Sequence, residues 1–183
     1  MKIAYLAPEL PALSATFVYN EILQLEKLGD SVVPFSVRKS KSIVEDTKLD
    51  GLKKNLVVIY DQRKYRIIFD HLNLLITKPS FYCKAVKYLI KDVFAIGFVS
   101  RNAFGVAYRF FFAASIANKL IEKDCQHLHA HFAHVPGDIA MYAGTMAGIP
   151  FSITAHANDI FERGWLLSEK VSRSAFFATI SIF

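Results

Sequence analysis

Residues 127 to 161 constrain the fold of this chain most tightly, because they form a predicted strand–helix–strand unit. Alternating side chains predict a strand over 127–132, with three histidines on one side of it. Pro136 suits the first turn of a helix, and Gly148 ends that helix before a second strand over 151–155. Two strands joined through a helix run parallel with a right-handed crossover, so the unit predicts a parallel sheet.

Inside this unit, apolar residues recur at helical spacing, which predicts that they form a buried stripe. The rest of the chain alternates between predicted strands and helices, so we expect an α/β fold with a doubly wound parallel sheet. The stripe consists of Ile139, Tyr142, Ala143, Met146 and Ala147, and the other strands are expected over 2–6, 31–37, 56–60 and 175–180.

The loop after the first strand, residues 7–16, holds two prolines and is expected to be irregular. A helix then begins at Ser14 or Thr16, either of which can cap its free amides, and Gly29 ends it. From Tyr65 to about Lys123 the pattern is mostly helical, with breaks at 78–80 and around 97–105. We therefore expect one domain over 1–183, with a basic, aromatic helical insertion at about 61–123.

The net charge of +6 is unevenly distributed. The segment between Arg38 and Arg109 carries most of the lysines and arginines and many of the large aromatic residues. Basic residues mixed with large apolar ones suit a surface that lies on an anionic membrane. The alternative is a solvated helical face of ordinary lysines. Nucleic acid is not expected as a partner, because no recognition motif is visible.

Two cysteines, Cys83 and Cys125, show no framework spacing, which favours a reducing compartment. The first apolar run is interrupted by Pro8 and is too short for a signal peptide. The longest run without Asp, Glu, Lys or Arg, Ile139–Asn158, is broken by two glycines and a proline, unlike a spanning helix. We therefore expect a cytoplasmic protein, with attachment to the inner membrane face as the alternative.

Ligands of open parallel sheets bind beyond the carboxyl ends of the strands, where His131, His134, His156 and Asp159 follow their strands. An imidazole such as that of His156 can donate to a phosphate or a hydroxyl, or take up a proton near neutral pH. The alternative for His156 is a ring satisfied by backbone groups. Asp159 stands three residues before Glu162, so it is also a candidate capping-box residue of the next helix.

Two glycine-rich motifs bind phosphate through backbone amides, Gly-x-Gly-x-x-Gly and Gly-x-x-x-x-Gly-Lys-Ser/Thr. Neither occurs in the first loop or elsewhere in the chain. What remains is a polar helix start at Ser14 and Thr16, whose free amides and dipole favour an anion. A simple N-cap is the alternative for these residues.

The histidines at 127, 129, 131 and 134 raise a second functional possibility, a zinc-dependent hydrolase. Metallohydrolases with a comparable run carry an acid where this chain has Phe132 and Ala133. His127 and His129 are explained more simply as strand residues that hydrogen-bond near the sheet, so we expect neither a metal site nor a cofactor. A third possibility is a non-catalytic, membrane-peripheral binding module that uses the basic segment.

Three stretches together resemble the amino-terminal domain of family 4 glycosyltransferases, of the colanic-acid and exopolysaccharide type. The resemblance covers nearly the whole chain and implies one half of a GT-B enzyme: two Rossmann-like domains facing a cleft, with retaining transfer from a nucleotide sugar and no obligatory metal. The stretches are 8–21 (PELPALSATFVYNE), 129–132 (HAHF) and 148–161 (GIPFSITAHANDIF).

The resemblance implies specific roles at the cleft. Ser14 and Thr16 would lie near the donor phosphate and the acceptor, and His156 beside the transferred sugar with Asp159 following it. The implied partners are a nucleotide-sugar donor and a saccharide or lipid-linked acceptor. The catalytic candidates are His156 and Asp159, and the donor- or acceptor-binding candidates are Ser14, Thr16, Asn20, His131, His134 and Asn158.

The chain also departs from the family. The carboxyl-terminal donor-binding domain is absent, and the last predicted strand is followed only by residues up to Phe183 instead of a Thr-Ile-Ser-Glu run into a helix. We therefore expect a truncated, acceptor-side half of a surface-polysaccharide glycosyltransferase. It would not turn over alone, because catalysis needs groups on both sides of a closed cleft.

Overall fold

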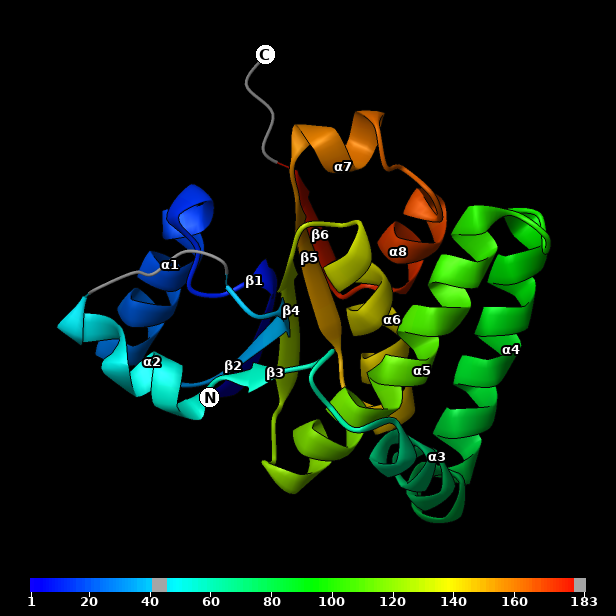
Figure 1. Ribbon diagram of the computed structural model, residues 1–183, viewed down its shortest axis with the longest axis horizontal. Coiled ribbons are helices and arrows are strands. Elements are labelled where there is room, and N and C mark those ends of the chain that lie inside the picture. The colour runs from blue at the N-terminus through cyan, green and yellow to red at the C-terminus, as the bar shows by residue number, and fades with distance from the viewer. Residues whose placement is uncertain (41–45, 180–183) are drawn as a thin grey trace.

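The computed structural model describes residues 1–40 and 46–179, which form one six-stranded sheet with every strand pair parallel. The strands lie in the order β3-β2-β1-β4-β5-β6, so the chain reverses its direction of travel across the sheet between β1 and β4 (Figure 1). The predicted parallel sheet is confirmed. The strands are β1 (Lys2–Glu9), β2 (Ser31–Arg38), β3 (Val57–Val58), β4 (His127–His131), β5 (Phe151–Ala155) and β6 (Phe176–Thr179).

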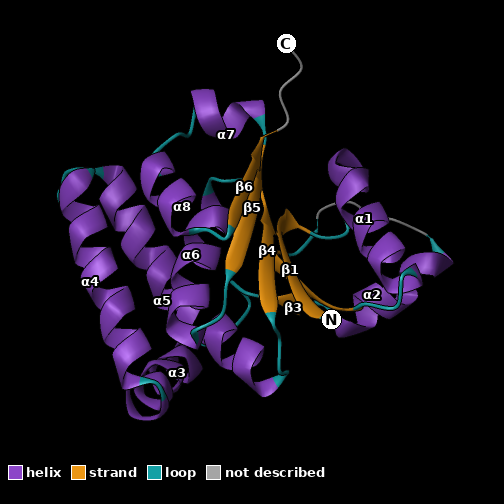
Figure 2. Ribbon diagram, turned by 180° about the vertical axis from the view of Figure 1, so that it is seen from behind, coloured by secondary structure: helices purple, strands orange, loops and turns teal. Residues whose placement is uncertain are grey.

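Helices cover both faces of the sheet, which confirms the doubly wound architecture. Figure 2 shows α1 and α2 on one side of the strands and α3 to α6 on the other. On the α1 side, Val18 and Ile22 pack against Tyr5 and Ala7 of β1. The helices are α1 (Thr16–Lys27), α2 (Asp50–Asn55), α3 (Lys64–Thr77), α4 (Pro79–Ala95), α5 (Arg101–Glu122), α6 (Val135–Ala147), α7 (Ala157–Phe161) and α8 (Leu167–Arg173).

The β4–α6–β5 unit forms as the sequence predicts. Pro136 lies in the first turn of α6, and Gly148 ends the helix in the left-handed conformation with φ +74°. The residues of the predicted stripe are buried, as expected. Helix α6 is in addition buried on nearly all its other sides. It lies between the sheet and the helices α4, α5 and α8, so apolar partners surround it.

The loop after β1 differs from its prediction. Strand β1 continues through Pro8 to Glu9. Strand β4 pairs with β1 only as far as Leu6, so the missing backbone N–H of Pro8 breaks no hydrogen bond to β4. A 3-10 turn over Leu13–Ala15 then leads into α1, and no side chain caps the helix. Neither predicted cap forms, because Ser14 lies inside the turn and Thr16 is already helical.

The expected helical segment consists of α3, α4 and α5. The break at 78–80 is confirmed, whereas the second break is shorter than predicted: Ser100 caps α5, and Gly105 lies inside that helix. Helix α5 belongs to the core, with Val106, Phe112 and Ile116 buried in it. No helix in the described ranges is both long and apolar enough to cross a bilayer.

A buried ionic cluster connects the outer helix α4 to the core. The carboxylate of Asp92 is fully buried and accepts hydrogen bonds from the Tyr142 hydroxyl (2.7 Å) and from both terminal nitrogens of Arg173 (2.7 and 2.6 Å). Three elements distant in sequence, α4, α6 and α8, therefore meet at one carboxylate.

The third strand is shorter than expected. Strand β3 contains two residues instead of the predicted five, and β6 begins at Phe176, one residue later than predicted. The predicted strand end at Ile180 and the chain end at Phe183 lie outside the described residues.

Candidate functional site

Two histidines meet at the carboxyl ends of β4 and β5. His131 is the last residue of β4 and His156 directly follows β5, and their ring centroids are 6.3 Å apart. Phe132 stacks on His156 at 4.3 Å, and Phe17 of α1 contacts both histidine rings. Parallel neighbouring strands bring these residues to one edge of the sheet, as predicted, while their functional role stays a prediction.

Asp159 holds this edge together through backbone groups. Its buried Oδ2 accepts hydrogen bonds from the backbone N–H of Ala133 and of His156, both at 2.9 Å. The predicted capping box with Glu162 is wrong, because α7 begins at Ala157 and Asp159 occupies its third position. The carboxylate therefore fixes the positions of the two loops that follow β4 and β5.

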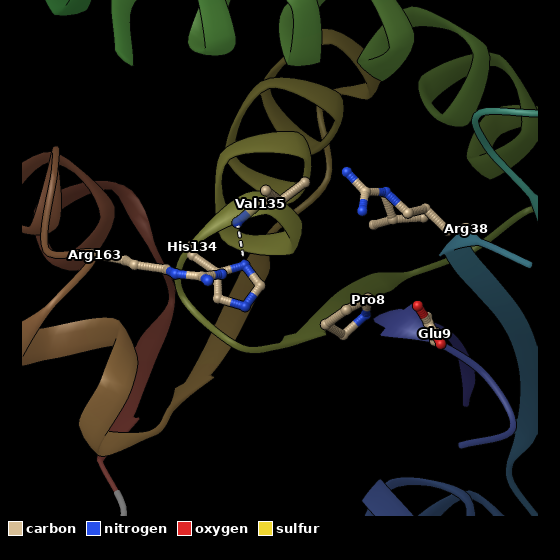
Figure 3. A pocket seen from close by; sticks show the side chains of 7 residues that line it. Pro8, Glu9, Arg38, His134, Val135 and Arg163 are labelled. Carbon is tan, nitrogen blue, oxygen red and sulfur yellow. Dashed lines mark hydrogen bonds between the residues drawn. The ribbon is translucent and has the colours of Figure 1, made fainter. Parts of the chain in front are cut away.

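A cavity of about 210 Å³ opens beside the loop that follows β4. Figure 3 shows Arg38 and Arg163 approaching it from opposite sides, with His134 between them. Neither guanidinium is paired with a carboxylate in the described part of the chain. Since the cavity also borders Val135 at the N-terminus of α6, its cations and helix dipole favour an anion, although Glu9 lines it as well.

A second cavity, of about 260 Å³, shares Pro8 and Glu9 with the first and is also lined by Ser14 and Phe132. Ser14 is thus the one member of the predicted helix-start pair that borders either cavity. Thr16, Asn20 and Asn158 are exposed and line neither of them; the amide of Asn158 donates to Glu162.

The imidazoles of His134 and His156 are held in the neutral form. Burial lowers the pKa of His134 to about 4 and lowers that of His156 as well. The Nε2 atom of His156 is buried and has no hydrogen-bond partner among the described residues. A neutral ring can accept or donate one hydrogen bond to a hydroxyl without carrying charge.

Glu21 belongs to the same neighbourhood and was not among the predicted site residues. Its Oε2 lies 3.0 Å from Nε2 of His131, and its Oε1 accepts a hydrogen bond from the Tyr5 hydroxyl at 2.6 Å. These contacts lower the pKa of Glu21 to about 2, the hydrogen bond with His131 being the main cause. The signal available in the sequence was the i, i+4 spacing of Phe17 and Glu21, which places both residues on one side of the predicted helix.

His127 and His129 hydrogen-bond near the sheet, as the simpler interpretation predicts. The Ser152 hydroxyl lies 2.6 Å from Nε2 of His127 and 2.7 Å from Nδ1 of His129. The four histidines at 127–134 do not converge as one group. Within the described residues, the set that does converge is Glu21, His129 and His131, whose possible ligand atoms all lie within 4.8 Å of one another.

Asp138 anchors the N-terminus of α6 behind the first cavity. Its buried carboxylate contacts Arg109 (2.7 Å), Lys170 (2.8 Å) and the indole N–H of Trp165 (2.9 Å). The carboxylate of Asp138 offsets one of the two positive charges of Arg109 and Lys170. The cations that line the cavity itself are Arg38 and Arg163.

A scan of the chain against protein-family models finds no match, and neither does a search of curated proteins. The site is therefore defined by its geometry: two imidazoles and two aromatic rings at the carboxyl edge of a parallel sheet, beside a cavity with two arginines.

Proposed function

We propose that this chain forms the Rossmann-like, acceptor-side domain of a GT-B glycosyltransferase. It would move a sugar from a nucleotide sugar to a saccharide or lipid-linked acceptor of surface-polysaccharide synthesis. The observation that carries the proposal is the pairing of His131 with His156 at the carboxyl edge of the sheet, 6.3 Å apart and beside the Arg38–Arg163 cavity. Ligands of open α/β sheets bind at this edge.

Each group has a chemical task in this proposal. His156, with an unpartnered ring nitrogen and a stacked Phe132, accepts or donates a hydrogen bond to a sugar hydroxyl. Arg38 and Arg163 attract the phosphates of the donor, since a guanidinium can bind phosphate through two parallel hydrogen bonds. Asp159 acts as a positioning residue, because its carboxylate already binds two backbone amides.

Ligand-binding measurements on the full chain test this proposal. Saturation-transfer NMR with UDP- and GDP-sugars, and with oligosaccharides, reports which ligand protons lie against the protein. We expect Arg163→Ala to weaken binding of the diphosphate ligands by about tenfold or more, the typical effect of a lost charge-assisted hydrogen bond. His156→Ala should weaken saccharide binding instead.

Lys27→Ala is the matched control for the loss of a cation, because Lys27 is exposed at the far end of α1. This variant should bind every ligand as the parent chain does. If no nucleotide sugar and no saccharide binds, or if the Arg163 and His156 variants bind unchanged, the proposal is wrong.

An anionic membrane surface is the second partner that we propose, with the protein peripheral on the inner face. Large apolar residues are exposed at the α4–α5 turn, including Phe94, Phe98 and Phe104, and the cations Lys91 and Arg101 flank them. Figure 1 shows this turn toward the end of the molecule to which β4 and β5 point. A lipid-linked acceptor in that membrane would therefore lie near the candidate site.

Vesicle flotation tests the membrane contact. The chain should float with phosphatidylglycerol vesicles, less with phosphatidylcholine, and less at high salt, since the charge contribution is screened. A Phe94→Ser, Phe98→Ser double variant should lose most of the binding, whereas Val171→Ser, which alters an exposed apolar residue of α8, should not. Equal flotation of all three proteins would contradict the proposal. Membrane contact without any sugar binding would favour the non-catalytic alternative.

A further inference from the structure

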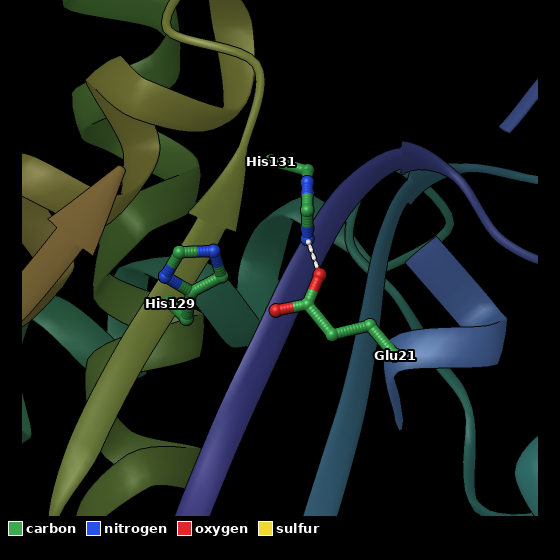
Figure 4. A group of neighbouring side chains, drawn as sticks. All are labelled: Glu21, His129 and His131. Carbon is green, nitrogen blue, oxygen red and sulfur yellow. Dashed lines mark hydrogen bonds and ion pairs between the residues drawn. The ribbon is translucent and has the colours of Figure 1, made fainter. Parts of the chain in front are cut away.

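Helix α1 and strand β4 bring three possible metal ligands together on the α1 side of the sheet. Figure 4 shows Glu21 from α1 facing His129 and His131 from β4. One ligand atom from each lies within 4.8 Å of the other two, and Oε2 of Glu21 is 3.0 Å from Nε2 of His131. Two ligands of one tetrahedral zinc ion lie about 3.3 Å apart, given bonds of about 2.0–2.1 Å. The Glu21–His131 spacing therefore already fits one edge of such a site.

The chemistry of the donor set suits a divalent transition metal. Two imidazoles and a carboxylate are typical ligands of Zn²⁺ in sites that keep a fourth position open. A carboxylate and an imidazole bind such a metal through the lone pairs of their deprotonated forms.

Neighbouring groups orient these side chains. The Tyr5 hydroxyl donates to Oε1 of Glu21, which leaves Oε2 for an ion. Nδ1 of His129 hydrogen-bonds the Ser152 hydroxyl at 2.7 Å, so Nε2 is the ring atom available to an ion. Binding an ion there would replace the longer contact, 3.2 Å, between Nε2 and the Thr154 hydroxyl. Hydrogen bonds of this kind fix the ring orientation of metal-binding histidines.

A cavity gives the group access to solvent. It measures about 330 Å³ on the open face of β4 and β5, and its lining includes Tyr5, Glu21, His129, Thr154 and Phe176. His131 is buried and is not among the residues that line this cavity. An ion can therefore enter from this side and keep one coordination position toward the cavity.

We propose that Glu21, His129 and His131 bind one divalent transition-metal ion, Zn²⁺ or a close relative, with a fourth position open to water in this cavity. The site revises the sequence-based expectation of no metal. It also differs from the histidine cluster considered there, because Glu21 takes part while His127 and His134 do not. The proposed metal site shares His131 with the proposed sugar-binding edge, but it does not require sugar transfer.

Calorimetric titration of the chelator-treated full chain with zinc chloride tests the site. We expect one ion per chain, and a Kd at least about tenfold higher in Glu21→Gln and in His131→Gln. Titration with Co²⁺ should give the strong visible absorption of a four- or five-coordinate ion in the parent chain and not in Glu21→Gln. His127→Gln is the matched control on the same strand and should bind as the parent does.

Urea unfolding of each metal-free variant separates lost binding from lost folding. Glu21 is half exposed on a helix, so the Glu21→Gln variant should fold. Its metal binding therefore tests the proposed site even if a histidine variant fails to fold. Absence of stoichiometric zinc in the parent chain overturns the inference, as does a Glu21 variant that binds normally or a His127 variant that is equally impaired. Because the readout is metal binding alone, these outcomes are distinct from a failure to bind sugar.

Discussion

At the scale of single residues, the buried carboxylate of Asp92 is expected to contribute strongly to stability. Its partners are the Tyr142 hydroxyl and the guanidinium of Arg173, which is itself largely buried. Removing one member of a buried ion pair leaves the other charge uncompensated in a low dielectric. The cost therefore comes from the arginine that remains as much as from the lost hydrogen bonds.

Asp92→Asn should lower the free energy of unfolding by about 3–5 kcal/mol, measured by urea denaturation. Asp61→Asn is the control, because Asp61 forms an exposed ion pair with Lys39 and its loss should cost at most about 1 kcal/mol. Similar midpoints for the two variants would mean that the buried cluster contributes little.

The candidate site itself was partly predictable at this scale. His131 lies at the end of one predicted strand and His156 directly follows the next, so their proximity follows from the parallel sheet alone. Glu21 and Arg163 were not predicted, because each reaches the site from a helix or loop whose position depends on tertiary packing. Local patterns give the spacing of residues along one element and do not give the distance between two elements.

At the scale of elements, glycine positions decide where helices can end. Gly148 adopts φ +74° at the end of α6, a conformation that costs an L-residue about 1–2 kcal/mol. A Cβ at this position would also meet the Phe81 ring at 2.9 Å. Gly51, in contrast, lies inside α2 with nothing within 4 Å of an added Cβ.

Gly148→Ala should therefore destabilise the chain by about 1–2 kcal/mol, more if the Phe81 ring cannot move aside. Gly51→Ala should stabilise it by up to about 1 kcal/mol, because alanine has the higher helix propensity and a less flexible unfolded state. Differential scanning calorimetry of the two variants measures both effects. Two shifts of the same sign would refute the conformational argument.

At the scale of the whole molecule, buried histidines make stability depend on pH. Burial lowers the pKa of His129 and of His134 from 6.5 to about 4. Between these values the unfolded chain binds protons that the folded chain does not, so stability is fully present above pH 6.5 and is lost as the pH falls toward 4. Burial also lowers the pKa of His71, His127 and His156.

Urea midpoints measured from pH 8 to pH 4 should therefore be level above about 6.5 and decline steadily below it. Each of the two large shifts is worth on the order of 3 kcal/mol when fully expressed. His134→Gln should make the decline shallower, because one titrating group is removed. A midpoint that is constant down to pH 4 would contradict this prediction.

The sequence by itself determined the parallel β4–α6–β5 unit, the α/β class and the edge at which His131 and His156 meet. These follow from the periodicity of apolar residues, from the glycine that ends the helix and from the right-handed crossover between parallel strands, which are local properties. Only the tertiary structure decided that α6 is buried on nearly all sides, that Asp92 and Asp138 anchor the outer helices, and that Glu21 faces His129 and His131. Such contacts join segments far apart in sequence, and their geometry depends on how whole elements pack.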